Sequence, residues 1–154
     1  MNVNRIGLAA ILLWVATIAV FAWFFVRGNI GAGTDNRTAV VLAASERDLV
    51  LTEMRGLLSA THAILDGLTR SDMKLVGQAA TSAGMAAAAD VNPMLMAKLP
   101  LSFKQLGIDV HHDMDALAKA AETGRPATEL QSMLVGTLAK CVACHAAWQL
   151  KAGN

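Results

Sequence analysis

The stretch "SERDLVLTEMRGLLSATHAILDGL", residues 45–68, decides the fold of this chain. Ser45 and Asp48 at its start form an acidic variant of the capping box that begins α-helices. Side chains then recur at steps of three and four residues, which places them on one face of a helix. This face comprises Val50, Met54, Leu57, Leu58, Thr61, Ile64, Leu65 and Leu68. The stretch therefore predicts a long amphipathic helix that buries one face against its neighbours.

Three further helices follow in the sequence. Residues 71–90 predict an Ala-rich helix, and the Pro-containing segment 91–100 predicts a connection without regular structure. A third helix is predicted to begin at Ser102, and a fourth at Thr128 with an apolar stripe that continues to Trp148. No convincing strand alternation is present. The pattern predicts an all-α fold, an antiparallel four-helix bundle with short connections.

The segment "IGLAAILLWVATIAVFAWFFV", Ile6–Val26, contains no charged residue. As a helix it would be roughly 30 Å long, about the thickness of the hydrocarbon core of a bilayer. A cleaved signal peptide usually has a shorter apolar core, and the sequence offers only a weak cleavage site after Gly33. A buried helix of this length would need a larger protein around it. We expect an uncleaved, single transmembrane anchor.

Composition divides the chain into three parts. Residues 1–27 are the predicted transmembrane anchor, residues 28–44 a flexible linker rich in Gly, Asn and Asp, and residues 45–154 the helical domain. Beyond the anchor, basic and acidic side chains nearly balance, and no basic stripe indicates a nucleic-acid partner. The sequence contains no Ser/His/Asp set, phosphate-binding glycine loop or paired carboxylates, so we expect no enzymatic activity.

The only two cysteines, Cys141 and Cys144, precede His145 in the motif C-V-A-C-H. On a helix, side chains at positions i, i+3 and i+4 project from one face. Two thiols at this spacing can form thioethers with the two vinyl groups of a haem, and the adjacent histidine can then bind the iron. C-x-x-C-H is the attachment signal for c-type haem. The motif predicts one covalently attached haem c, with His145 as the proximal iron ligand.

Other uses of the two cysteines are weaker. A structural zinc site needs two more ligands, for which only His62, His111 and His112 are candidates, and their spacing matches no known finger. A thioredoxin-like dithiol requires a βαβ setting, which the sequence lacks. A disulfide or two buried thiols are the remaining alternatives.

With this motif on its last helix, the chain resembles the cytochrome c-prime family, including its low-spin class II relatives. The resemblance covers roughly residues 45–151 and implies a four-helix bundle with the haem near the end of the last helix. The family often has an aromatic residue three positions after the haem histidine, and Trp148 matches this position, so the resemblance implies that Trp148 is one of the cofactor-binding residues. It commonly has Arg or Lys at the next position, where this chain has Gln149. Family members often form homodimers.

The sixth iron ligand decides the function. In an antiparallel bundle the first and fourth helices are neighbours, so a haem near the end of the last helix faces the beginning of the first. Met54 lies at the corresponding depth, and a thioether ligand would raise the potential of the iron, as suits electron transfer. A methionine in this position is also a common core residue. The rival residue is Leu58, which would leave the iron five-coordinate and able to bind nitric oxide or carbon monoxide.

The sequence thus predicts a membrane-anchored monohaem cytochrome that transfers single electrons. The resemblance implies assembly outside the cytoplasm, and therefore a single-pass protein of the bacterial inner membrane with its C-terminal domain in the periplasm. Expected partners are redox proteins or subunits of a respiratory complex. The alternative is a gas-binding protein with an open iron site.

Overall fold

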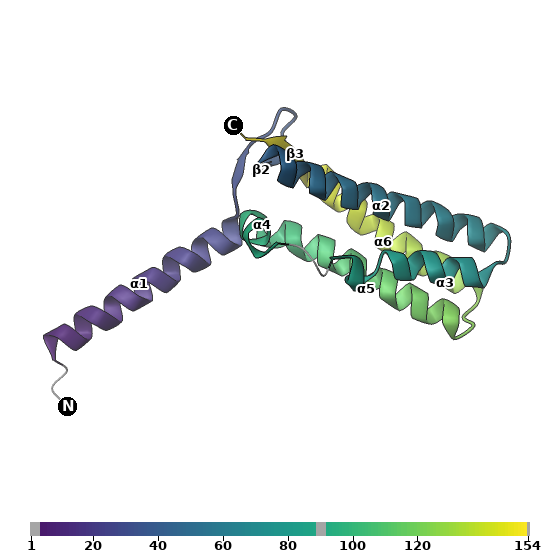
Figure 1. Ribbon diagram of the computed structural model, residues 1–154, viewed down its shortest axis with the longest axis horizontal. Coiled ribbons are helices and arrows are strands. Elements are labelled where there is room, and N and C mark those ends of the chain that lie inside the picture. The colour runs from purple at the N-terminus through teal and green to yellow at the C-terminus, as the bar shows by residue number, and fades with distance from the viewer. Residues whose placement is uncertain (1–3, 89–91, 154) are drawn as a thin grey trace.

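The computed structural model describes residues 4–88 and 92–153. This part of the chain is mostly helical, with six α-helices and three short strands (Figure 1). The helices are α1 (Arg5–Arg27), α2 (Ala44–Thr69), α3 (Met73–Ser82), α4 (Pro93–Lys98), α5 (Leu101–Glu122) and α6 (Ala127–Ala147), with a 3₁₀ turn, η1, at Met85–Ala88. The strands are β1 (Ile30–Ala32), β2 (Thr38–Leu42) and β3 (Trp148–Ala152). Parts of three predicted segments, residues 1–3 of the anchor, 89–91 around the end of the second helix, and 154 of the domain, lie outside the described residues.

Four helices, α2, α3, α5 and α6, share one hydrophobic core. Each of them contributes a side chain that is almost completely buried: Ile64, Val76, Leu117 and Leu134. Burial of an aliphatic side chain of this size contributes roughly 1.5–3 kcal/mol. The predicted helical face of residues 45–68 is therefore correct in its position but too wide. Leu58 is 70% exposed, because the buried face of α2 is narrower than the predicted stripe.

The predicted second helix is interrupted. Helix α3 ends at Ser82, and Gly84 separates it from η1. A Cβ atom at Gly84 would collide with the Asp115 carboxylate of α5, whose Oδ2 accepts a hydrogen bond from the Met85 N–H at 3.0 Å. This close approach turns the chain toward α5, which is why the Ala-rich stretch does not continue as one helix.

The segment 91–100, predicted as an irregular connection, contains α4. Pro93 occupies the first helical turn, where its missing N–H has no consequence, and the Asn92 side chain accepts a hydrogen bond from the Met94 N–H at 2.8 Å. The prolines therefore define the beginnings of α4 and α5 rather than preventing helix formation: Pro100 is the residue that precedes α5.

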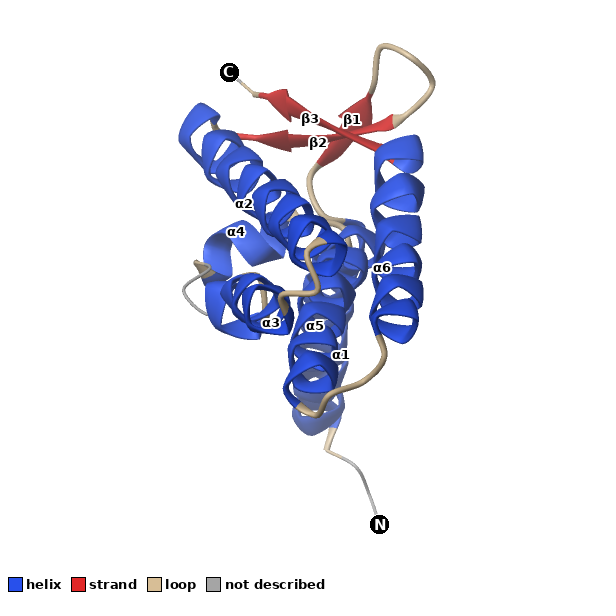
Figure 2. Cartoon of the chain, turned by 90° about the vertical axis from the view of Figure 1, so that its right-hand side faces the viewer, coloured by secondary structure: helices blue, strands red, loops and turns tan. Residues whose placement is uncertain are grey.

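Three strands form a small sheet at the end of the domain where α2 begins and α6 ends (Figure 2). Strand β2 is central, antiparallel to β1 and parallel to β3. Ala39, Val40 and Leu42 are buried, and the last two join a second core cluster with Val50 of α2 and residues of α4 and α5. The expectation of a flexible linker at residues 28–44 and of an all-α domain is corrected here, because this segment is ordered by strand pairing.

The last helix is shorter than predicted. Helix α6 ends at Ala147, and Trp148 has the extended backbone of β3, with φ −123° and ψ 148°. Thr38 of β2 is the strand partner of Trp148. The parallel pairing with β2 therefore ends α6 two residues after His145.

Helix α1 extends away from the other helices (Figure 1). It is the one described helix that is long and apolar enough to cross a membrane by length and composition, criteria that an N-terminal signal sequence also meets. None of its residues is buried in the protein. Its last residues meet the domain at α4 and at the beginning of α5.

Candidate functional site

A cavity of about 360 Å³ lies at the end of the domain near the sheet, between α2, α4, α5 and α6. Its lining is mostly apolar. The aliphatic and aromatic residues are Leu49, Val50, Leu57, Leu95, Leu99, Phe103, Leu106, Ile108 and Val110. A cavity of this size with few polar groups is typical of a site for a cofactor or small molecule. We call it the helix-end pocket.

The last two turns of α6 place the C-x-x-C-H motif on this pocket. Cys141, Cys144 and His145 all line it, as their spacing on one helical face predicts. Both thiols are free and half-buried, whereas His145 remains exposed. The donor set and its surroundings fit a haem: two thiols and one imidazole project from one helix into an apolar space.

Burial raises the pKa of the Cys141 thiol, and it also raises the pKa of the Cys144 thiol, to which the neighbouring Cys141 adds a smaller increase. The neutral thiol is therefore favoured at both positions. A reactive dithiol needs a lowered pKa and a stable thiolate, because the thiolate is the nucleophile. The surroundings of these two cysteines consequently do not favour a thioredoxin-like redox function.

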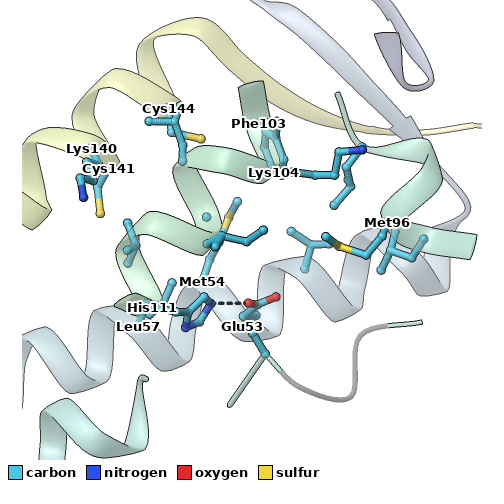
Figure 3. Close-up of a pocket in the computed structure, with 18 of the residues that line it drawn as sticks. Glu53, Met54, Leu57, Met96, Phe103, Lys104, His111, Lys140, Cys141 and Cys144 are labelled. Carbon is cyan, nitrogen blue, oxygen red and sulfur yellow. Dashed lines mark hydrogen bonds and ion pairs between the residues drawn. The ribbon is translucent and has the colours of Figure 1, made fainter. Parts of the chain in front are cut away.

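Met54 of α2 lines the same pocket (Figure 3). It is half-buried and belongs to the part of α2 that faces α6 and the beginning of α5. Leu57, three residues later, also lines the pocket, since side chains three apart share a helical face. Leu58 does not line it: one further residue rotates the side chain by about 100°, and Leu58 points toward solvent. Leu57, and not the expected Leu58, therefore lines the pocket beside Met54.

A polar pair that no pattern in the sequence indicates lies at the edge of the pocket. His111 of α5 is 3% exposed, and its Nε2 lies 2.8 Å from Glu53 Oε1 of α2 (Figure 3). Its Nδ1 lies 2.8 Å from the Ala83 carbonyl oxygen. The hydrogen bond with Glu53, opposed in part by burial, raises the pKa of His111, and the Ala83 carbonyl adds to the increase. Both neighbours are acceptors, so the protonated ring satisfies both by donating from each nitrogen.

The burial of His111 could be predicted in part from the sequence. It follows Val110 on the apolar stripe of α5, while its neighbour His112 is exposed, because adjacent side chains on a helix lie about 100° apart and do not share one face. Glu53, however, is 58 positions away in the chain. No local pattern indicates this pairing.

Two lysines line the pocket, and both are engaged elsewhere in the protein. Lys140 Nζ lies 2.7 Å from Asp113 Oδ2, a pair between α6 and α5. Lys104 is only 5% exposed and donates a hydrogen bond to the Phe25 carbonyl oxygen of α1 at 3.0 Å. Burial lowers the pKa of Lys104.

The end of α6 is held by residues of the segment that was expected to be a linker. Arg37 Nη1 donates to the carbonyl oxygens of His145 and Trp148, at 3.2 and 3.4 Å. The His145 carbonyl lies in the last turn of α6, where carbonyls have no partner within the helix, and Trp148 is the residue that follows the helix. A cation is favourable at a helix C-terminus. Asp35 orients the Arg37 guanidinium through a salt bridge of 2.6 Å and accepts a hydrogen bond from Gln149 Nε2 at 3.0 Å.

Trp148 lies behind the pocket rather than in its lining. Its ring contacts Phe103 edge to face, with 6.1 Å between the ring centroids, and Phe103 lines the pocket. Trp148 therefore supports the pocket wall from the sheet side, where the sequence analysis placed it among the cofactor-binding residues.

The residues that the structure describes do not bring together the ligands of a zinc site. Within residues 4–88 and 92–153, no group of three or more His, Cys, Asp or Glu side chains is placed to hold a metal ion. His62 and His112 are exposed and His111 is paired with Glu53. A haem requires less of the protein, since it brings four of its own nitrogen ligands and needs only one or two axial side chains.

No protein-family model, no curated protein and no solved structure matches this chain.

Proposed function

We propose that the protein is a membrane-anchored monohaem c-type cytochrome that carries single electrons. One observation carries this proposal: Met54 and the C-x-x-C-H motif, which are far apart in the sequence, line the same apolar pocket. Cys141 and Cys144 would hold the haem through thioethers, and His145 and Met54 would bind its iron. A bound haem would supply a one-electron iron couple.

The residues of the chain have separate tasks in this proposal. The two cysteines fix the haem position, so that affinity does not depend on noncovalent contacts. The apolar lining, including Leu57 and Phe103, excludes water and keeps the local dielectric constant low, which favours the less charged ferrous state. The neutral thioether of Met54 has the same effect and raises the potential. Arg37 holds the His145 backbone in place by donating a hydrogen bond to its carbonyl oxygen.

The shared core of α2, α3, α5 and α6 supports the antiparallel four-helix bundle expected from the resemblance to the cytochrome c-prime family. The apolar helix α1 supports a single membrane span at the N-terminus. Haem attachment outside the cytoplasm would place the domain in the periplasm, next to membrane-bound redox partners or as a subunit of a respiratory complex. A homodimer is compatible with this arrangement.

The test begins with the protein matured in a bacterial host that has a haem-attachment system. Intact-mass analysis should find the mass of one haem added to the polypeptide, and a Cys141→Ser/Cys144→Ser variant should lack it. The reduced protein should have the absorption bands of low-spin iron, and these should not change on adding carbon monoxide. Bare polypeptide would refute the proposal as a whole.

A gas-binding protein is the second candidate, and Leu57 favours it. This side chain lines the pocket one turn from Met54, and a leucine over the iron would leave the sixth position open. High-spin ferrous bands that shift on adding carbon monoxide would support this function and reject Met54 as a ligand. Met54→Ala should then leave the spectrum unchanged, whereas in the electron carrier it should convert low-spin iron to high-spin iron.

A further inference from the structure

The junction between α1 and the domain is tightly packed at Gly28. This residue follows the last residue of α1 and has φ +66°, a conformation that glycine adopts readily. A Cβ atom here would lie 2.6 Å from both the Leu99 carbonyl carbon and the Lys98 carbonyl oxygen. These are backbone atoms between α4 and α5, so the neighbour cannot move away as a flexible side chain would. The chain turns in direct contact with the domain.

Lys104 of α5 closes the end of α1. Its ammonium group donates to the Phe25 carbonyl oxygen at 3.0 Å and lies 3.5 Å from the centroid of the Phe25 ring. The Phe25 carbonyl belongs to the last turn of α1 and has no partner within the helix. A buried cation at a helix C-terminus, over an aromatic ring, is held by the helix dipole and by a cation–π interaction together.

Asn29, the residue after Gly28, forms hydrogen bonds with both α4 and β2. The Asn29 N–H donates to the Lys98 carbonyl oxygen at 2.6 Å, and the Asn29 side chain donates to the Val41 carbonyl oxygen at 2.8 Å. The Val41 N–H in turn donates to the Asn29 carbonyl oxygen at 2.9 Å. Strand β1 begins at Ile30. No unattached residue therefore separates the apolar helix from the domain.

This junction belongs to the same end of the molecule as the pocket. Lys104 lines the helix-end pocket, and so do Leu95 and Leu99. Helix α4 lies beside the end of α1 (Figure 1), and on its outer side Pro93, Met94 and Ala97 are exposed, Met94 by 68%. This outer side is apolar, and we call it the α4 face.

We propose that α1 and the helical domain form one rigid unit, and that the α4 face rests on the bilayer that α1 crosses. The occupant of this face is the lipid surface, because the face continues from a helix whose length and composition fit a membrane and is joined to it without a spacer. The end of the domain that holds the pocket is thereby kept at the membrane, where it can reach only partners in or on the bilayer. The proposal rests on the membrane span of the proposed function and is independent of the haem.

Rigidity is tested by the distance between two nitroxides in the full chain in lipid nanodiscs. The labels are attached through keto amino acids at Ile11 and Leu65, which leaves the cysteines for the haem. Double electron–electron resonance should give one narrow distance distribution. Lys104→Ala should broaden it, and Lys119→Ala, an exposed lysine on the same helix, should not. A broad distribution in the unaltered chain, or no effect of Lys104→Ala, would overturn the rigid joint.

The position of the α4 face is tested with lipids that carry a chelated nickel ion on the headgroup. A nitroxide at Met94 should relax several times faster in such nanodiscs, and one at Leu65, at the far end of α2, should change little. Equal effects at both sites would overturn the membrane contact. A mature chain that lacks residue 11 would refute the anchor itself, and a protein without haem but with the expected distances would refute only the cytochrome.

Discussion

Replacing His111 with leucine tests the buried pair at the edge of the pocket. Leucine fills a similar volume with an apolar side chain and removes both hydrogen bonds, each 2.8 Å long. A charge-assisted hydrogen bond contributes about 1.5–3 kcal/mol and a neutral one about 0.5–1.5 kcal/mol. Because Glu53 is one-third exposed, we take the lower part of the first range. His111→Leu should lower the free energy of unfolding by about 2–3 kcal/mol near pH 6.

The effect has a characteristic dependence on pH. The pKa of His111 is raised in the folded protein, so the folded state holds its proton more tightly than the unfolded state does. This contribution to stability is complete below the unfolded pKa of about 6.5 and is lost as the pH rises through the folded pKa. The difference between the unaltered protein and His111→Leu should therefore shrink above pH 6.5, toward the value of the hydrogen bonds that a neutral ring can keep.

Urea denaturation followed by circular dichroism, at several pH values between about 6 and 9, measures this difference. His112→Leu is the matched control, because the neighbouring side chain is exposed, and it should change stability by less than about 0.5 kcal/mol. Glu53→Gln should remove most of the pH dependence, since the Glu53 carboxylate is the main cause of the raised pKa. An unchanged stability in His111→Leu, or a difference that grows with pH, would contradict the pairing.

Three further substitutions probe other parts of the molecule. If the haem is bound as proposed, Met54→Ala should convert low-spin iron to high-spin iron in the absorption spectrum, whereas Met94→Ala, at an exposed methionine, should not. Arg37→Ala should lower the free energy of unfolding by about 1–3 kcal/mol, because the carbonyl oxygens of His145 and Trp148 lose their donor. Arg37→Lys should recover part of this loss, and an unchanged melting temperature would contradict the role of Arg37 at the end of α6. Leu42→Ala should cost about 2–5 kcal/mol, since this side chain is 1% exposed in the sheet, and a surface-like effect below 0.5 kcal/mol would show that residues 28–44 are not ordered.

The helices could be predicted from the sequence because their signals are local. Apolar side chains at three- and four-residue steps identified α2, α5 and α6, and Val50, Ile64 and Leu134 are buried as expected. The errors lie at the edges of these patterns. Leu58 sits beside the stripe of α2 and is exposed, because a periodic pattern does not determine how wide a face the neighbouring helices cover.

The sheet could not be predicted in the same way. Strand β2 is short, and its β-branched residues Val40 and Val41 are compatible with several structures. Its partner β3 is paired in register from Thr38 with Trp148, across almost the whole domain. Such pairing depends on contacts that α2 and α6 create by bringing the two segments to the same end. Local sequence carries little information about it.

The candidate site also has some residues that a local sequence signal predicts and others that depend on tertiary contacts. The C-x-x-C-H motif is a local signal, and Met54 followed from the depth of two helices in a bundle; the structure brings all of these side chains to one pocket. The polar residues around it arise from tertiary contacts. Glu53 reaches His111 across the gap between α2 and α5, and no spacing in the sequence indicates this pair.

The sheet also gives the C-x-x-C-H motif a physical connection to the N-terminal part of the chain. Helix α6 ends where β3 pairs with β2, and the loop between β1 and β2 supplies Arg37 to the carbonyl of His145. The same hairpin begins immediately after Asn29, which is hydrogen-bonded to α4. A displacement of α1 would therefore act on the hairpin and, through Arg37, on the backbone that carries His145. If the haem is bound as proposed, lengthening the junction by a Gly-Ser insertion after Gly28 should alter the iron potential even though no pocket residue has changed, and an unaltered potential would show that the hairpin does not transmit strain from the anchor.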